Sequence, residues 1–358
     1  MTVKLIASRA SEAILDRRSE IALALVEREF ARHPEIGQGY GKLGRDKSLQ
    51  DAGSHLSHLA QALALNNRDL FIDYVAWAKG LLVQREVLAS DLSCQMNCLA
   101  ELLRERLPAT VGPLAAEFVL SAVRAIPAMA DDIPTFIRDD EPLSPLAHQY
   151  LQALRRGQRH LASRLVLDAV AAGAPVQDVY LQVFEWAQHE IGRLWQTNRV
   201  TVAEEHYCSA ATQMIMSQLY PHVFATARNN RTMIATCVSG DLHEIGVRMV
   251  ADFFEMDGWN TFYLGGNMPH ADIIDAIVER RADLLAVSAT LSHHVDDVRD
   301  LIQAVRRHPT GRKVRILVGG YPFSHDPELF QKVGADGSAS NAQQAIALAN
   351  RLLRSDTP

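Results

Sequence analysis

Cysteine is scarce in this 358-residue sequence, which contains only Cys94, Cys98, Cys208 and Cys237. Thiols so few and so scattered argue against a disulfide framework and suit reduced cysteines. Cys94 and Cys98 lie four residues apart, but no neighbouring cysteine or histidine cluster completes a zinc set. The sequence therefore predicts neither a disulfide-stapled fold nor a zinc centre.

Long apolar runs and an excess of basic residues are also missing. No run of about 18 apolar residues is present, and the N-terminus lacks the pattern of a secretory leader. The formal net charge is -6 and the pI is near 6.2, without a local basic patch of the kind that binds nucleic acid. We therefore expect a cytoplasmic protein that binds neither a membrane nor nucleic acid directly.

The composition, with 48% apolar and 22% charged residues, is that of a globular chain with two or three domains. Up to about residue 125, apolar residues recur at spacings of three and four, which predicts a helical bundle. A stretch with four prolines and five acidic residues follows over 125–145 and indicates a linker. We place the first domain at 1–140.

Helical periodicity resumes over 141–228, which predicts a second, smaller helical bundle. Over 229–358, short apolar runs alternate with amphipathic segments. Buried strands that alternate with helices favour a parallel sheet with helices on both faces. The expected fold class is all-α followed by α/β, with a doubly wound, Rossmann-like C-terminal domain.

Ligands of such a domain bind beyond the carboxyl ends of its strands. The string DLHEIG, Asp241–Gly246, comes directly after the first apolar run. The string SAT, 288–290, ends the third run, and Gly319 with Gly320 ends the fourth. We expect all three to line one edge of the sheet.

With 41 residues between DLHEIG and SAT and 28 between SAT and the glycine pair, this pattern resembles the signature of methionine synthase-type cobalamin-binding domains. The resemblance implies that His243 replaces the cofactor's dimethylbenzimidazole as lower axial ligand of cobalt, while the nucleotide tail enters the sheet. Imidazole suits cobalt, and a ligating histidine usually donates its other N–H to a carboxylate, for which Asp241 is the candidate.

The remaining cofactor-binding candidates share small size or a polar group: glycines allow close approach and hydroxyls bond polar tail atoms. They are Leu242, Gly246, Ser288, Thr290, Gly319 and Gly320. The alternative reading is structural, with a helix-capping carboxylate, a surface histidine and packing glycines.

The second bundle contains Trp195 and, after nine residues, Glu205–His206. This spacing resembles the helical cap of cobalamin-dependent photoreceptors, which implies that these residues lie over the upper corrin face, beside a 5'-deoxyadenosyl group. Gln196 stands where the best-known members carry a light-state histidine ligand, which leaves His206, His189 or water for that position. The alternative is a core tryptophan and an acidic first helical turn.

In the N-terminal part, the stretches DAGSHLSHLAQAL, 51–63, and DLFIDYVAWAKGLLVQREVL, 69–88, look like the helical domain of photocobilins, which bind a bilin such as biliverdin beside cobalamin. Such a pocket needs apolar walls, polar groups at the pyrrole nitrogens and cations for the propionates. The candidates for walls, polar groups and cations, in that order, are Phe71, Tyr74 and Trp77, then His55 and His58, then Lys79 or Arg85. The alternative is a dimerisation bundle with core aromatics and half-exposed histidines.

The leading functional hypothesis is a light sensor and not an enzyme. Photolysis of bound adenosylcobalamin, with biliverdin as a second chromophore, changes the quaternary structure of a homo-oligomer or its contact with a separate effector protein. One alternative is a corrinoid protein that carries a methyl group between methyltransferases and uses the same lower-face residues. Another is a binding module that reads cofactor abundance.

Overall fold

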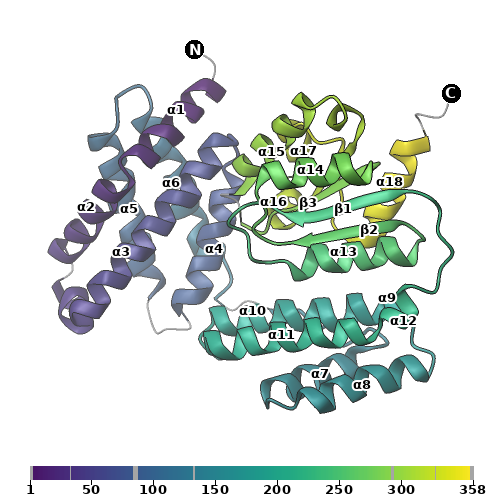
Figure 1. The fold of residues 1–358 in the computed structure, drawn as a ribbon. Coiled ribbons are helices and arrows are strands. Elements are labelled where there is room, and N and C mark those ends of the chain that lie inside the picture. The colour runs from purple at the N-terminus through teal and green to yellow at the C-terminus, as the bar shows by residue number, and fades with distance from the viewer. Residues whose placement is uncertain are drawn as a thin grey trace. The chain divides into compact units, whose positions relative to one another are not determined.

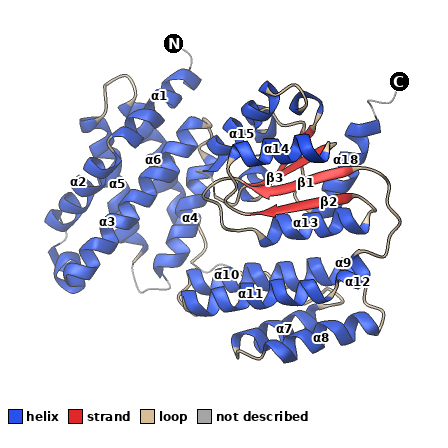
Figure 2. Cartoon of the chain, in the orientation of Figure 1, coloured by secondary structure: helices blue, strands red, loops and turns tan. Residues whose placement is uncertain are grey.

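The computed structural model describes residues 3–32, 34–83, 88–131, 134–291, 294–326 and 328–354. Contacts divide the chain into two units, Met1–Pro134 and Thr135–Pro358. The division falls inside the proline- and acid-rich stretch. The first unit is helical in its described residues, and the second combines helices with a sheet (Figure 2). None of the described helices is long and apolar enough to span a membrane.

The first unit is a helical bundle around an apolar core in which Leu25, Leu56 and Phe118 are almost completely buried. Amphipathic stripes supply this core. Its described elements are α1 (Val3–Asp16), α2 (Arg18–Arg32), α3 (Pro34–Ala64), α4 (Asp69–Val83), α5 (Ala89–Arg106), α6 (Gly112–Ala125) and η1 (Ile126–Ala128).

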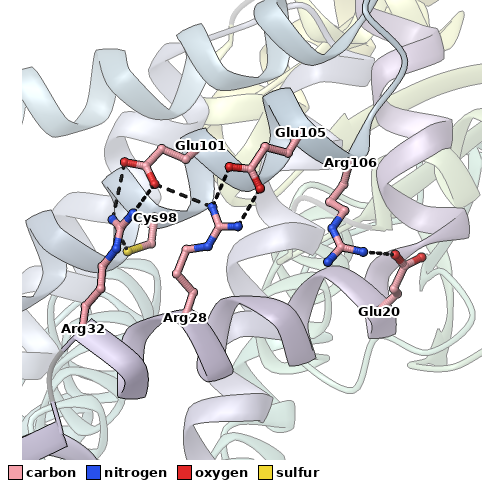
Figure 3. A network of polar contacts seen from close by, with 7 residues as sticks. All are labelled: Glu20, Arg28, Arg32, Cys98, Glu101, Glu105 and Arg106. Carbon is pink, nitrogen blue, oxygen red and sulfur yellow. Dashed lines mark hydrogen bonds and ion pairs between the residues drawn. The ribbon is translucent and has the colours of Figure 1, made fainter.

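A row of ion pairs joins α2 to α5 (Figure 3). The Arg28 guanidinium lies 2.6 Å from a Glu105 oxygen, and that of Arg32 lies 2.7 Å from Glu101. Arg32 also donates to the Cys98 sulfur at 3.3 Å. Because the acidic partners are about half exposed, each pair stabilises the unit by less than about 1 kcal/mol. The row specifies which helix faces meet more than it adds stability.

The second unit opens with a four-helix bundle in its described residues, which we call the cap (Figure 1). Tyr150, Phe184 and Ile215 lie in its buried core. A capping box of Thr201 and Glu204 starts the last long helix. The first two helices are α7 (Ser144–Arg155) and α8 (Arg159–Ala171). The third is continuous and consists of α9 (Val176–Val179), the π-helical η2 (Tyr180–Glu185) and α10 (Trp186–Gln196). The fourth is α11 (Val202–Gln218), and the short α12 (Tyr220–Val223) follows it.

A five-stranded parallel sheet follows, in the order β2-β1-β3-β4-β5. Its strands are β1 (Thr232–Cys237), β2 (Asn260–Gly265), β3 (Leu284–Ser288), β4 (Arg315–Gly319) and β5 (Gly337–Ser338). The flanking helices are α13 (Ile245–Met256), α14 (His270–Arg280), α15 (Val295–Arg307), η4 (Gly311–Lys313), α16 (Tyr321–His325), α17 (Leu329–Val333) and α18 (Ala342–Arg354). The predicted fold class, helical bundles followed by a Rossmann-like domain, is confirmed.

The strand order reverses direction at β1 and β3, which opens a crevice at their carboxyl ends. On one face of the sheet, Phe254 of α13 and Ala349 of α18 pack against Met233 of β1. α14 and α15 lie over the other face (Figure 1). Helices on both faces explain why β1 and β3 read as continuous apolar runs in the sequence.

The cap packs on α13 through a shared apolar core. Met249 and Phe253 of α13 and Ala342 of α18 are buried in the same cluster as the cap residues. Truncating a fully buried phenylalanine such as Phe253 typically costs about 3–5 kcal/mol. The cap and the sheet domain therefore behave as one folded unit.

Polar contacts surround this shared core. The Tyr180 hydroxyl donates to Asp252 Oδ2 at 2.9 Å, and the Arg248 guanidinium donates to the Ser217 hydroxyl at 2.7 Å. Burial raises the pKa of Asp252 to about 6. An ionised carboxylate at this position therefore costs the folded state free energy.

This cost predicts a pH-dependent effect of Asp252→Asn. The Asp252 carboxyl stabilises the fold below about pH 4, and this contribution is lost as the pH rises through about 6. From pH 4 to 7, the free energy of unfolding of the variant should rise by up to about 3 kcal/mol relative to wild type, because the amide never ionises. Urea unfolding followed by tryptophan fluorescence measures this difference.

Asp272→Asn, which replaces an exposed carboxyl on α14, is the matched control and should show no such divergence. A pH-independent difference between Asp252→Asn and wild type would contradict the assigned cost of burying this charge.

Candidate functional site

Asp241, in the loop between β1 and α13, organises the carboxyl edge of the sheet. Its side chain is fully buried. One oxygen accepts from the His243 backbone N–H at 3.0 Å and from His243 Nδ1 at 2.8 Å, while the other accepts from the Thr290 backbone N–H at 2.7 Å. Burial alone would raise the pKa of Asp241, but the hydrogen bonds from His243 and Thr290 outweigh it and lower the pKa to about 2. A permanent carboxylate thus ties the loop after β1 to the loop after β3.

The His243 ring extends from the buried Asp241 carboxylate towards solvent. Its side chain is 58% exposed although its Nδ1 is held by Asp241. With the Nδ1 proton donated to the carboxylate, the lone pair of Nε2 is available to a ligand. The hydrogen bond to Asp241 also raises the pKa of His243. The more basic imidazole donates its Nε2 lone pair to a metal more strongly.

The three predicted glycines occupy different environments. Gly320 has φ +97°, and a Cβ there would lie 2.1 Å from the Ala289 carbonyl oxygen, so the fold itself requires this glycine. At Gly319 the nearest atom to an added Cβ is the Ala339 oxygen at 3.4 Å, and at Gly246 nothing lies within 4 Å. Only Gly246 leaves open space beside the His243 loop.

The other two predicted tail contacts lie on β3 and just beyond it. Ser288 is the last residue of β3 and pairs in register with Cys237 of β1 and Gly319 of β4. Thr290 contacts Asp241 through its backbone and not through the hydroxyl that sequence reasoning singled out. Sequence reasoning and the structure thus place both residues at the same edge, with a different atom of Thr290 engaged.

Large apolar side chains stand exposed around this edge. Leu242, Leu291 and Tyr321 follow the ends of β1, β3 and β4 and are 75%, 36% and 51% exposed. On the cap, Trp195 at the end of α10 and Val202 at the start of α11 are 44% and 53% exposed. Exposed apolar groups gathered in this way are typical of a surface that a ligand or partner covers.

The cap and the His243 loop are close neighbours. Gln213 of α11 donates to Glu244 at 3.3 Å, and the charge of Glu205 contributes to the raised pKa of His243. Glu205 also pairs with His206 and accepts from Ser209 at 2.9 Å. The structure therefore places the Glu205–His206 pair on the cap helix beside the predicted ligand.

Gln196 and His189 complete the set of predicted cap residues. Gln196 is the last residue of α10, directly after Trp195. The His189 ring lies 5.2 Å from that of Phe136, and burial lowers its pKa.

Sequence reasoning missed three polar residues of this edge. His294 is buried, with Nδ1 3.3 Å from Asp241 Oδ2. The Glu244 carboxylate accepts from the Gly266 backbone N–H at 3.0 Å, and the Asn267 side chain accepts from Gly240 at 2.8 Å. Glu244 lies within the DLHEIG string and was open to prediction. No local pattern marks His294 or Asn267, because they reach the site through the fold.

The predicted bilin residues of the first unit lie together in its interior. His55, only 4% exposed, is bonded to the Tyr74 hydroxyl at 2.8 Å and to the Gln95 side-chain oxygen at 2.9 Å. Burial lowers the pKa of His55 to about 4. His58 stacks on Tyr74 with ring centroids 3.8 Å apart, and Trp77 lies 5.7 Å from the same ring. These polar groups bond each other within the helical core.

The other three candidates give the bilin hypothesis no further support. Phe71 is fully buried, and Lys79 donates to the Met129 carbonyl oxygen at 2.6 Å and pairs with Asp131 at 2.8 Å. Arg85 lies outside the described residues. Bilin binding in this unit stays a prediction.

The cap and the sheet domain are similar to known cobalamin-binding proteins. Two models of the B12 binding domain match residues 231–347 and 146–220. Dimethylamine corrinoid protein 3 of Methanosarcina acetivorans is 26% identical over 192 residues, which cover 52% of this chain and 89% of that protein. Its namesake from Methanosarcina mazei is 30% identical over 116 residues, which cover 32% of this chain and 68% of that protein.

A solved structure shows the same fold. The monomethylamine corrinoid protein of Methanosarcina barkeri matches with a TM-score of 0.52 at 20% identity, covering 59% of this chain and 99% of that protein. Neither B12 binding model extends into the first unit. The matches support a cobalamin-type cofactor for the cap and the sheet domain.

These findings correct the functional prediction. The light-sensor hypothesis is wrong, because the matching relatives are dimethylamine and monomethylamine corrinoid proteins and not photoreceptors. Because Gln196 replaces the usual histidine, His206, His189 or water was the expected light-state ligand, and that question disappears with the light-sensor hypothesis. The motifs at Asp241–Gly246, 288–290 and Gly319–Gly320 lie within the match to the B12 binding domain and do not specify photochemistry.

The contrast between two glycines yields a stability prediction. Gly320→Ala should lower the free energy of unfolding by about 3 kcal/mol or more, because the methyl group meets the Ala289 carbonyl at a strained φ. Gly246→Ala, in open space at the start of α13, should leave stability unchanged or raise it by up to about 1 kcal/mol. Chemical denaturation of cofactor-free protein compares the two, and equal losses would contradict the contrast.

Proposed function

Because this chain belongs to the family of corrinoid proteins built around a B12 binding domain, we propose that it is a cobalamin-binding methyl carrier. It would take up a methyl group with one methyltransferase and deliver it with another. A bound cobalt corrin supplies a metal centre that accepts and releases methyl groups. The observation that carries the proposal is the His243 imidazole, fixed on a buried carboxylate with Nε2 facing outward.

The residues at this edge fit a cobalamin. Cobalt favours imidazole nitrogen, and His243 presents one on a ring whose orientation Asp241 fixes. Leu242, Leu291 and Tyr321 offer apolar contacts to the rim of a corrin. The open space at Gly246 admits a bulky group close to the backbone.

A chain of contacts holds His243, the proposed lower ligand of cobalt, in place. In this proposal His243 binds cobalt through Nε2, and Asp241 holds the ring. Asp241 is held in turn by the Thr290 backbone N–H and lies 3.3 Å from His294. Such supporting residues typically change metal affinity by about 10- to 100-fold when they are replaced.

The cap residues shield the opposite side. With a cofactor bound, Trp195 and Val202 would exclude water from it on the cap side, and Glu205 with His206 would offer it polar groups. The cargo in this proposal is a methyl group and not 5'-deoxyadenosyl. The cap would then have to yield to each partner, which would open the apolar core that it shares with α13 and break polar contacts such as Tyr180–Asp252 and Arg248–Ser217.

A methyl-carrier role implies partner proteins and a cellular compartment. The methyltransferases are separate chains, and the carrier is not an enzyme by itself. All four cysteines are free thiols, which suits a reducing cytoplasm. The first unit, which neither B12 binding model covers, has no assigned part in methyl transfer.

The ligand assignment predicts the effect of His243→Ala. The variant should bind hydroxocobalamin at least about tenfold more weakly, and the bound cofactor should lack the absorption of imidazole-ligated cobalt. Equilibrium dialysis and absorption spectra measure both. His308→Ala, which removes an imidazole at the far end of α15, is the control and should match wild type. A wild-type spectrum in His243→Ala would remove the basis of the assignment.

Carriage itself can be tested directly. Cobalamin-loaded protein, reduced under anaerobic conditions and given isotope-labelled iodomethane, should retain one methyl label per bound cofactor through gel filtration in the dark. The reason is that the buried anchor keeps the cofactor in place. Protein that keeps its cofactor but takes up no label would instead be a binding module that reads cofactor abundance.

A further inference from the structure

A cationic groove lies on the sheet domain, away from the site described above. It has a volume of about 490 Å³ and is formed by α15, η4 and α17. Its cations are Arg299, Arg306, Arg307, Arg312 and Lys332. Ile302 and Val333 lie at its floor and are only 2% and 3% exposed, the side chains of Gln303 and Gln331 add amides, and no acidic residue lines it. This groove stands out in a chain whose net charge is -6.

Three of the five cations already have acidic partners outside the groove. Arg299 lies 2.9 Å from Asp296, Arg306 lies 2.6 Å from Asp336, and Lys332 lies 2.7 Å from Asp326. These carboxylates orient the three side chains and neutralise part of their charge. The net positive charge of the groove therefore comes from the other two.

Arg307 and Arg312 provide that charge. Both side chains are exposed, and within the described part of the chain neither pairs with a carboxylate. Arg307 donates to the Gln303 side chain at 3.4 Å, and Arg312 donates through Nε to the Arg306 carbonyl at 3.2 Å. Both outer nitrogens of Arg312 are available to bind an anion in a bidentate manner, and Arg307 offers Nη1 while its Nη2 donates to Gln303.

The groove and the cofactor site lie at opposite ends of the parallel strands. His243 follows the carboxyl end of β1, whereas Arg307 ends α15 and Arg312 precedes the amino end of β4. Along α15 alone, the 13 residues from Val295 to Arg307 span about 20 Å. A molecule bound in the groove therefore leaves the cofactor edge open to a second protein.

The polar side chains that α15 contributes follow a line. Arg299, Gln303 and Arg307 are spaced four residues apart on one face of α15, which spreads them over about 12 Å. Lys332 and Arg312 flank this line from α17 and η4. A single phosphate needs donors that converge on it, whereas an extended chain with spaced carboxylates matches a line of donors.

We propose that this groove docks an acidic segment of a partner protein. The docking holds the partner at the end of the domain opposite the cofactor edge. Carboxylates of the segment pair with Arg307 and Arg312. The inference goes beyond the methyl-carrier function and does not require that the bound cofactor carries a methyl group.

The test uses the full chain and a fluorescein-labelled peptide of eight glutamates. Fluorescence anisotropy in about 50 mM salt should show saturable binding that weakens as salt is added. The double variant Arg307→Glu/Arg312→Glu should weaken binding about tenfold or more, because two attractive sites become repulsive. Circular dichroism checks that the variant keeps its fold, and Arg307→Gln/Arg312→Gln should give an intermediate loss.

The matched control is Arg159→Glu/Arg164→Glu, which changes two exposed arginines of α8 at the same spacing and by the same charge. It should stay within about twofold of wild type if local charge governs binding. Absent peptide binding, or equal losses in the two Glu double variants, would overturn the proposal. So would displacement of the peptide by inorganic phosphate at the same concentration as unlabelled peptide, which would indicate a general anion site.

His243→Ala separates this inference from the proposed function. The variant should lose imidazole ligation of cobalamin and still bind the peptide as wild type does. Peptide binding that disappears in His243→Ala would tie the groove to the cofactor edge and overturn the docking proposal, while the ligand assignment would stand.

Discussion

The buried carboxylate of Asp241 is the interaction on which the site depends. A charge removed from water must be satisfied by donors, and Asp241 takes them from two loops that follow different strands. Because its oxygens face both His243 and Thr290, the edge of the sheet and the direction of the imidazole are set together. A carboxylate left with fewer donors would be costly, so the loop has little freedom to adopt another conformation.

The helix α13 connects this anchor to the cap. Its first turn holds Gly246 beside the His243 loop, while Phe253, two turns later, is buried in the apolar core of the cap. Glu244, just before the helix, contacts both Gln213 of α11 and the loop at Gly266. A displacement of the cap would therefore shift the loop that carries His243, through one rigid helix and one side chain.

The mistaken light-sensor prediction has an identifiable cause. Asp241 and His243 lie within one match to the B12 binding domain, and Trp195, Glu205 and His206 lie within the other. Matches of this kind indicate a cobalamin-type cofactor and do not identify the group that the cobalt carries. The relatives, and not the motifs, argue against a photoreceptor.

Local sequence patterns accounted for the helices, for the parallel sheet and for the pairing of Asp241 with His243, because these depend on periodicity or on residues two positions apart. The tertiary structure alone decided the rest. His294 reaches Asp241 across 53 positions, and Gly320 is required by the carbonyl of Ala289 on the neighbouring chain segment. Likewise, the polar cluster at His55 is closed by Gln95 from another helix. Such contacts join segments distant in the chain, so only the packing of the elements determines which groups meet.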